Sequence, residues 1–257
     1  MSRYEAMFRR SGNAGVFGAF VMLGDPDLAT SAAILDQLVT GGADMIEVGI
    51  PFSDPVADGP VIQAAAVRAL ANGTTPADCF ALLGHFRACH PDVPVGILTY
   101  ANLALARGRD DFYARAARAG VDSVLVADVP VLEAAPYAEA ARAHGIDPVL
   151  IAAANTPAHR LLEIAKLGGG YTYCVARTGV TGADHDAQFD HRTMLDVLLE
   201  GGASPPNFGF GISRPDQVRA ALAAGAAGAI SGSAIVERIA RGEDVSGFVR
   251  EMKAATL

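Results

Sequence analysis

A single carboxylate inside an apolar stretch is the residue best suited to acid–base chemistry. Glu47 lies within residues 45–50, a continuous apolar run typical of a strand buried on both faces. Burial disfavours the charged form of a carboxyl group and raises its pKa unless a partner compensates. The alternative is a structural salt bridge, but no other predicted strand contains an obvious cation. A carboxyl group with a raised pKa can both donate and accept protons.

Two further carboxylates follow in a proline-rich loop. Asp54 and Asp58 lie within residues 51–60, which hold three prolines whose rigidity would fix where the side chains point. Either carboxylate could work with Glu47, or it could cap a helix that starts at Pro60. The loop alone leaves these two interpretations open.

Three glycine-rich segments, residues 179–182, 209–213 and 231–234, follow the last three predicted strands. Glycine-rich loops at the ends of strands can bind phosphate, because backbone N–H groups and a helix dipole hold the dianion without a cation. The alternative is that these glycines only form tight turns. A phosphate site of this kind suits a chain whose formal net charge is −8.

The residues that several other kinds of catalysis require are absent from the sequence. There is no G-x-S-x-G motif, and the histidines lack the spacing of a metal pair on one helix face. Lys166 and Lys253 are the only lysines and neither lies in a predicted strand, so a Schiff-base mechanism has no candidate. We predict no metal site, and any carbon–carbon cleavage would run by acid–base chemistry alone.

Eight short apolar runs alternate with helical segments and predict a (β/α)₈ TIM barrel with extra helices and long loops after strands two and six. A doubly wound sheet is the alternative, but the expected glycine fingerprint is absent after the first strand. The predicted strands are 16–23, 45–50, 95–98, 123–127, 148–152, 171–175, 208–211 and 228–231, and the predicted helices include 28–40, 76–90, 110–119, 132–144, 157–166 and 214–224.

Composition limits the class of protein. The 257 residues are 51% hydrophobic and 19% charged, which excludes disorder and suits one domain spanning 1–257. The acidic balance argues against nucleic-acid or membrane binding. Three cysteines without a C-x-x-C pair favour the reducing cytoplasm. Residues 9–23 imitate a signal peptide but end without a small-residue cleavage site.

The motifs together resemble the tryptophan synthase α chain family. The segment 47–63 (EVGIPFSDPVADGPVIQ) is its most specific part, and the matches run collinearly over nearly the whole chain, including residues 23–26, 99–102, 120–130, 179–182, 210–213 and 225–236. The resemblance implies a lyase of tryptophan biosynthesis that cleaves indole-3-glycerol phosphate to indole and glyceraldehyde 3-phosphate. It implies no cofactor in this chain, and a pyridoxal-phosphate β chain as partner in an α₂β₂ heterotetramer.

The resemblance also implies roles for individual residues. Glu47 matches the general acid–base and Asp58 the partner of the indole nitrogen. Three residues match the face toward the β chain: Phe52, Asp54 and Asn102. The residues that match the substrate pocket are Phe20, Leu98, Leu125, Ile151, Tyr173 and Phe210 around the indole, and Thr181, Gly182, Gly211, Gly232 and Ser233 around the phosphate.

The chain departs from the family pattern at Met22, at residues 152–154, at Arg214 and in loop 183–190, and none of these removes a proposed catalytic group. Two other functions stay open on the sequence: another phosphosugar barrel enzyme, which would be expected to use a Lys base or a Glu–His pair, and a non-catalytic activator of a β chain.

Overall fold

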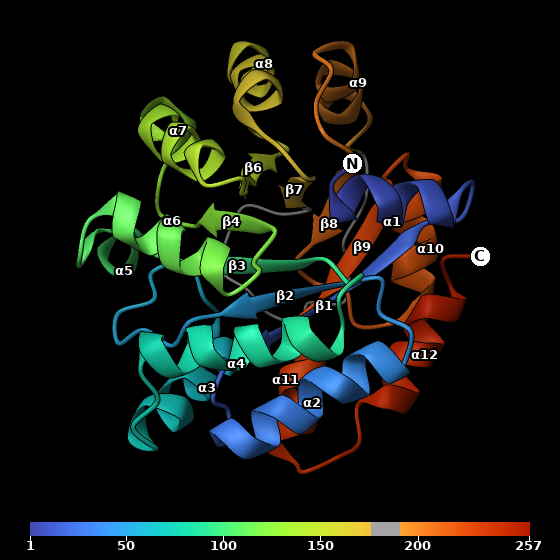
Figure 1. Ribbon diagram of the computed structural model, residues 1–257. Coiled ribbons are helices and arrows are strands. Elements are labelled where there is room, and N and C mark those ends of the chain that lie inside the picture. The colour runs from blue at the N-terminus through green and yellow to red at the C-terminus, as the bar shows by residue number, and fades with distance from the viewer. Residues whose placement is uncertain (176–190) are drawn as a thin grey trace.

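The computed structural model describes residues 1–175 and 191–257. Within these residues, parallel strands form one sheet in the order β5-β4-β3-β2-β1-β9-β8-β7-β6 (Figure 1). Its strands are β1 (Val16–Met22), β2 (Met45–Gly49), β3 (Val95–Thr99), β4 (Ser123–Val126), β5 (Asp147–Pro148), β6 (Leu150–Ala153), β7 (Thr172–Val175), β8 (Pro206–Gly209) and β9 (Gly228–Ser231). Each of the eight predicted strands is present.

The two edge strands of this sheet are halves of one barrel position. Only Val149 separates β5 from β6, and its N–H donates to the Val124 carbonyl of β4 before the chain turns to pair with β7. The N–H groups of residues 147 and 149 both face β4, and Pro148 between them has no N–H to donate to the other side. The barrel therefore closes through the chain itself, which confirms the (β/α)₈ prediction.

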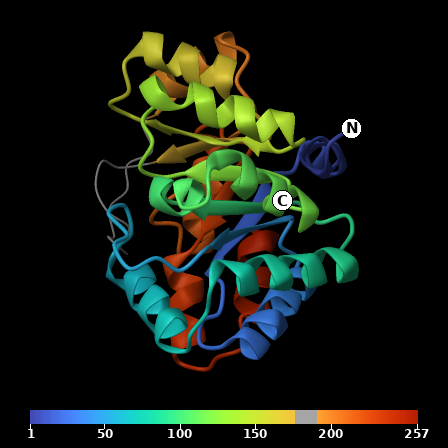
Figure 2. The ribbon, with the colours of Figure 1, turned by 60° about the vertical axis from the view of Figure 1, so that its left-hand side comes forward.

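Helices surround the strands on the outside, as Figures 1 and 2 show. The predicted helix 28–40 forms with those bounds, and the predicted helix 132–144 divides into a 3₁₀ turn and α7. The helices of the described residues are α1 (Arg3–Ser11), α2 (Leu28–Thr40), α3 (Pro60–Ala71), α4 (Pro76–Cys89), α5 (Ala101–Leu105), α6 (Arg109–Arg118), η1 (Val131–Glu133), α7 (Ala135–Ala143), α8 (Ala158–Leu167), α9 (Arg192–Glu200), α10 (Pro215–Ala223), α11 (Ser233–Ala240) and α12 (Ser246–Ala254).

Local sequence explains where helices begin. Thr75 caps α4 in a reciprocal capping box with Asp78, and Pro76 occupies the first helical position, where no N–H is needed. The long segment after β2 contains α3, so the extra length predicted there is partly helical. Its remaining part, residues 50–59, is the loop that carries Asp54 and Asp58.

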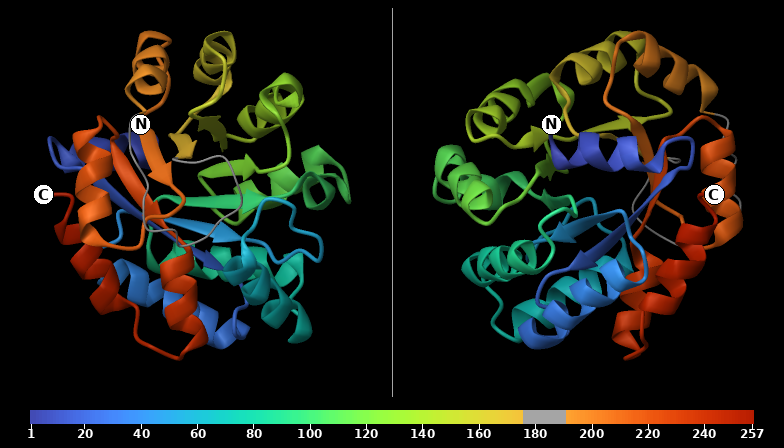
Figure 3. Two further views of the ribbon diagram at one scale, coloured as in Figure 1. Left: turned by 180° about the vertical axis from the view of Figure 1, so that it is seen from behind. Right: turned by 45° about the vertical axis from the view of Figure 1, so that its right-hand side comes forward.

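Two apolar layers hold the barrel. One lies between the strands and the outer helices, and the second fills the inside of the barrel. The N-terminal helix α1 supplies Tyr4 and Met7 to the inner layer, and the Tyr4 hydroxyl shares a 2.8 Å hydrogen bond with Ser123 at the start of β4. Thus α1 covers the end of the barrel where the strands begin (Figure 3).

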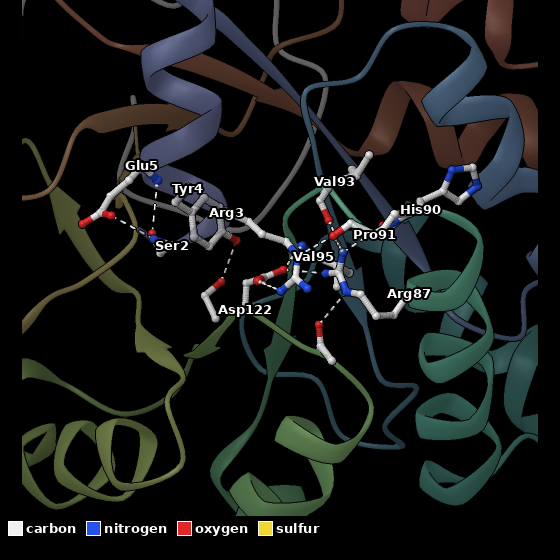
Figure 4. A network of polar contacts seen from close by, with 12 residues as sticks. Ser2, Arg3, Tyr4, Glu5, Arg87, His90, Pro91, Val93, Val95 and Asp122 are labelled. Carbon is white, nitrogen blue, oxygen red and sulfur yellow. Dashed lines mark hydrogen bonds and ion pairs between the residues drawn. The ribbon is translucent and has the colours of Figure 1, made fainter.

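A charged cluster fastens this end, as Figure 4 shows. The Asp122 carboxylate accepts from the Arg3 guanidinium at 2.8 Å and from the Arg87 guanidinium at 2.6 Å. It also accepts from the Val95 N–H at 2.8 Å. One side chain thereby joins α1, α4, β3 and β4.

The predictions about membranes and targeting can be compared with this fold. No helix within the described ranges is long and apolar enough to cross a membrane. Residues 16–22, which imitate part of a signal peptide, form β1 between β2 and β9 and are buried throughout.

Candidate active site

A cavity of about 210 Å³ opens where the strands end and the βα loops begin. It brings together carboxylates from β2 and its loop, apolar side chains from several strands, and the loops after β8 and β9. The described residues that line it are Phe20, Glu47, Ala57, Asp58, Ile62, Leu98, Ala127, Ile151, Tyr173, Phe210, Gly211, Ile212, Ser213, Ile230, Gly232, Ser233, Ala234, Glu237 and Arg238.

Glu47 lines this cavity from β2 and is buried, with 1% of its surface exposed. Burial raises the pKa of its carboxyl group to about 7, although a hydrogen bond from the Tyr171 hydroxyl to Oε1 opposes that rise. Its second oxygen, Oε2, has no hydrogen-bond partner among the described residues. Glu47 forms no salt bridge within that part of the chain, so the sequence-based alternative of a structural ion pair fails there.

Tyr171 is a site residue that the sequence analysis missed. It lies two positions before Tyr173, so both side chains project from the same face of one strand segment. Its ring packs on Tyr4 of α1 with centroids 5.4 Å apart. The period-two spacing of the two tyrosines within the predicted strand 171–175 is the signal that could have identified it. Burial keeps the pKa of Tyr171 well above its usual range, so its hydroxyl is a donor.

Asp58 is buried as well, with 7% exposed, and it borders the same cavity. Burial raises the pKa of its carboxyl group, and a hydrogen bond from the Tyr100 side chain opposes that rise. The Tyr100 hydroxyl in turn accepts from the Ala57 N–H at 3.3 Å. Asp58 precedes the N-cap of α3, which is Gly59, and no side chain caps that helix. Of the two alternatives left open for Asp58, capping of α3 is therefore the one that does not hold.

The apolar wall matches the predicted set with one exception. Phe20, Leu98, Ile151 and Phe210 line the cavity, with Tyr173 packed edge-on against Phe210 at 6.1 Å between centroids. Leu125 is buried inside the barrel but does not border the cavity.

The backbone after β8 has an unusual shape. Phe210 has φ of 66°, the one non-glycine residue of the described ranges in the left-handed region, and Gly211 follows with φ of 77°. A left-handed conformation at an aromatic residue costs on the order of 1–3 kcal/mol and tends to occur at functional sites. Gly209 precedes them because a Cβ there would lie 2.1 Å from the Tyr173 hydroxyl oxygen. This turn aims Phe210 and Gly211 at the cavity.

The glycine-rich loops after β8 and β9 meet at one end of the cavity. Gly211 and Ser213 come from the first loop, and Gly232 and Ser233 from the second, where α11 begins. The Ser231 hydroxyl ties the loops together by donating to the Ile212 carbonyl at 2.7 Å. Free N–H groups at a helix start suit an anion. Thr181 and Gly182, the remaining predicted phosphate residues, lie outside the described residues.

The three residues predicted to face a partner are outside the cavity. Asp54 and Asn102 are exposed, and Phe52 is partly exposed with its ring 5.4 Å from that of Tyr100. Among the described residues, no group of three or more His, Cys, Asp or Glu side chains is placed to hold a metal ion.

Met22, residues 152–154 and Arg214, which depart from the family pattern, are not among the residues that line the cavity, and loop 183–190 lies outside the described residues. Met22 is buried at the end of β1, and residues 152 and 153 belong to β6. Arg214 pairs with Asp216 at 3.1 Å at the start of α10.

Fold and site together define a (β/α)₈-barrel enzyme whose cavity, at the ends of the strands, holds a buried carboxyl group and the glycine-containing loops after β8 and β9. Residues 8–256 match the family model described as tryptophan synthase alpha chain. A relative of that name from Aeromonas hydrophila is 54% identical over 266 residues, covering 100% of this chain and 99% of the relative. One from Shewanella amazonensis is 53% identical, with 100% of both chains covered.

Solved structures agree. A tryptophan synthase structure from Mycobacterium tuberculosis aligns with a TM-score of 0.90 at 28% identity, covering 99% of this chain and 98% of that one. A chain of a tryptophan synthase complex from Pyrococcus furiosus aligns with a TM-score of 0.83 at 33% identity, covering 94% and 99%. The chain belongs to the tryptophan synthase alpha chain family. It is therefore a lyase that cleaves indole-3-glycerol phosphate in tryptophan biosynthesis.

Proposed function

We propose that Glu47 and Asp58 carry out this cleavage, with Glu47 as the group that moves protons. The observation that carries the proposal is the Glu47 carboxyl group itself. It is buried in the wall of the cavity, its pKa is raised to about 7, and its Oε2 has no partner among the described residues. A group that must act first as acid and then as base works best with a pKa near the working pH.

The reaction breaks the bond between indole C3 and the glycerol chain. Protonated Glu47 donates its proton to C3, which leaves positive charge on the ring, centred at N1. The C3–C bond then breaks, its electron pair restoring the indole ring. As the chain hydroxyl becomes the aldehyde, the Glu47 carboxylate takes up the hydroxyl proton. Glu47 is protonated again at the end, so the cycle needs no external acid or base.

Asp58 would stabilise the charge at N1. Its carboxylate can accept the indole N–H in a charge-assisted hydrogen bond, which is strong in a site shielded from water. The Tyr100 hydrogen bond favours the ionised form of Asp58, which this role requires. The apolar side chains of Phe20, Leu98 and Ile151 would enclose the indole ring.

The substrate phosphate would bind at the end of the cavity formed by Gly211, Gly232 and Ser233. These residues share the loops that the Ser231–Ile212 hydrogen bond joins. Thr181 and Gly182 would complete the site from the loop after β7.

A β chain is the partner we propose, because similar solved chains come from tryptophan synthase complexes. The exposed side chains of Asp54 and Asn102, together with Phe52, would form part of the contact in an α₂β₂ assembly. Residues 1–257 would act as one domain without a cofactor, and pyridoxal phosphate would sit in the β chain. The free cysteines, Cys79, Cys89 and Cys174, favour a reducing cytoplasmic compartment.

Indole release from purified protein tests the proposal. Wild-type protein should release indole from indole-3-glycerol phosphate, and Glu47→Gln should lose roughly two to four orders of magnitude in rate. The variant should still bind glycerol 3-phosphate, which shows that its site is intact. If Glu47→Gln keeps most of its turnover, the assignment of Glu47 is wrong. Wild-type protein that is inactive alone but stimulates a β chain would instead favour a non-catalytic activator.

A further inference from the structure

The charges around the cavity are unbalanced for a substrate that carries a phosphate. Among the described residues, three carboxylates line it, those of Glu47, Asp58 and Glu237, and the whole chain has a formal net charge of −8. Among the described lining residues, Arg238 is the one that carries a permanent positive charge. The position of the Arg238 guanidinium relative to the loops after β8 and β9 therefore decides whether it can act on the phosphate.

Two contacts fix the position of the Arg238 side chain. It lies on α11, five residues after Ser233, and its Nη1 donates back to the Ala234 carbonyl at 2.7 Å. The guanidinium carbon lies 3.9 Å from the centre of the Phe248 ring of α12. Ala234 and Ser233 themselves line the cavity. The guanidinium is thus fixed beside the first turn of α11.

Neither contact neutralises the guanidinium. The Ala234 oxygen is a carbonyl and the Phe248 ring offers only its π face, so both orient the cation while leaving its full charge. The ion pairs of the described residues involve other arginines, including Arg241 with Glu243 three positions further along. The Glu243 carboxylate, which pairs with Arg241, is near enough to interact electrostatically with Arg238, but no ion pair of the described residues joins the two. The guanidinium therefore keeps N–H donors available for an anion.

We propose that Arg238 strengthens binding of the substrate phosphate, offsetting the neighbouring Glu237 carboxylate and complementing the backbone N–H groups of Gly232 and Ser233. This inference rests on the proposed function, since it assigns a further specificity-determining residue to the same site. The chemical class that Arg238 selects is a phosphate monoester dianion, not the indole ring.

A purely structural role makes a different prediction. If Arg238 only packs α11 on α12, replacing it would lower the free energy of unfolding and leave phosphate affinity unchanged. If it acts on the anion, its removal should raise KM for indole-3-glycerol phosphate with little change in kcat, because the cation acts on ground state and transition state alike.

The experiment measures binding of glycerol 3-phosphate, and separately of indole, to full-length protein by titration calorimetry. For Arg238→Gln we expect roughly five- to tenfold weaker binding of glycerol 3-phosphate and unchanged binding of indole. Arg241→Gln is the matched control: it makes the same change in net charge at the end of the same helix, and Arg241 does not line the cavity. Its affinity should equal that of the wild type.

Two more variants guard against misfolding. Arg238→Lys keeps the charge but loses the planar, stacked guanidinium, so it should bind glycerol 3-phosphate more tightly than Arg238→Gln and less tightly than the wild type. Glu237→Gln removes the opposing carboxylate and should bind it more tightly. Added salt should weaken binding more steeply in the wild type than in Arg238→Gln.

Equal affinities for Arg238→Gln and Arg241→Gln would overturn the inference, as would unchanged affinity in Glu237→Gln if Arg238→Gln fails to fold. If the wild type cleaves the substrate but Arg238→Gln and Arg241→Gln bind glycerol 3-phosphate equally tightly, the role of Arg238 is refuted and the proposed function stands. Wild-type protein that neither binds glycerol 3-phosphate nor releases indole would refute the proposed function instead.

Discussion

At the scale of single residues, the Glu47 carboxyl group couples activity to stability. In the native state the Glu47 carboxyl group stays protonated up to about pH 7, whereas in the unfolded chain it loses its proton near its ordinary pKa of 4.5. Raising the pH through this window therefore favours unfolding, because the unfolded state binds fewer protons there. The shift corresponds to roughly 3 kcal/mol of lost stability above pH 7. A buried acid of this kind is a cost that the fold carries for its chemistry.

Glu47→Gln should therefore be more stable than the wild type at pH 8, by up to roughly 3 kcal/mol, and about equally stable at pH 4.5. Glutamine has similar size and keeps an oxygen that can accept from the Tyr171 hydroxyl. Urea unfolding at several pH values measures the difference. A stability gain that is the same at every pH would contradict a titrating Glu47 as its cause.

The tyrosine beside Glu47 should set the pH dependence of the reaction. The Tyr171 hydroxyl donates to the carboxylate and lowers the Glu47 pKa, so Tyr171→Phe should raise that pKa beyond about 7. Because the first step uses protonated Glu47, kcat/KM should fall at high pH, and this fall should move to higher pH in the variant.

Tyr173→Phe is the control for that experiment. Tyr173 projects from the same face of the strand segment and lines the cavity, but burial and the Glu47 and Asp58 charges explain its raised pKa without a hydrogen bond to Glu47. Its removal should change the rate without moving the high-pH limb. If the fall of kcat/KM at high pH moves equally in Tyr171→Phe and Tyr173→Phe, the hydrogen bond from Tyr171 does not set the pH dependence.

At the scale of elements, the sequence predicts the strands well because strands buried on both faces have continuous apolar runs. The fifth strand shows the limit: its run predicts one strand, and the structure has β5 and β6, since Pro148 lacks an N–H on the side of β7. The predicted helix 132–144 fails in its first turn, where η1 precedes α7. Hydrophobic pattern alone does not record either break.

Some residues of the site could likewise be predicted from the sequence, and others could not. Glu47 was identifiable because a carboxylate is conspicuous in an apolar strand, and Gly232 because glycine-rich loops end the last strands. Phe210 came from the family resemblance alone. Arg238 was not identifiable, because it looks like an ordinary exposed residue of an amphipathic helix. Only the backward turn of its side chain to the Ala234 carbonyl puts it beside the cavity. Such side-chain directions depend on packing between helices that the sequence does not display.

Helix α1 covers the end of the barrel where the strands begin, and its attachment there should depend on the Asp122 carboxylate. Asp122 binds Arg3, Arg87 and the Val95 N–H, and it is 9% exposed as a side chain. Asp122→Ala would leave the largely buried Arg87 guanidinium without its ion-pair partner, so we expect a loss of about 3 kcal/mol in the free energy of unfolding. Urea unfolding of the variant measures this.

Glu243→Ala is the matched comparison, since it also removes a carboxylate from an arginine. The Arg241–Glu243 pair is exposed on both sides, and water screens it, so the free energy of unfolding should not change measurably. Similar losses in both variants would mean that the Asp122 cluster is no stronger than a surface pair.

At the scale of the whole molecule, a short loop connects the proposed partner face with the catalytic cavity. Phe52 packs against the Tyr100 ring, and Tyr100 holds both Asp58 and the Ala57 N–H. A β chain that covers Phe52 and Asp54 would therefore press on the residues that position Asp58. Binding of the partner and the rate of cleavage should be linked through this loop.

Replacing the exposed Asp54 by alanine tests that link without disturbing the cavity, because Asp54 does not line it. Asp54→Ala alone should release indole at the wild-type rate, since its cavity is unchanged. Titration with the β chain should show weaker association by sedimentation, and a higher β-chain concentration should be needed to reach full stimulation. Glu133→Ala serves as the control: Glu133 is another exposed carboxylate outside the cavity, on η1. Should Asp54→Ala and Glu133→Ala associate equally tightly, the face containing Asp54 is not the one that meets the β chain.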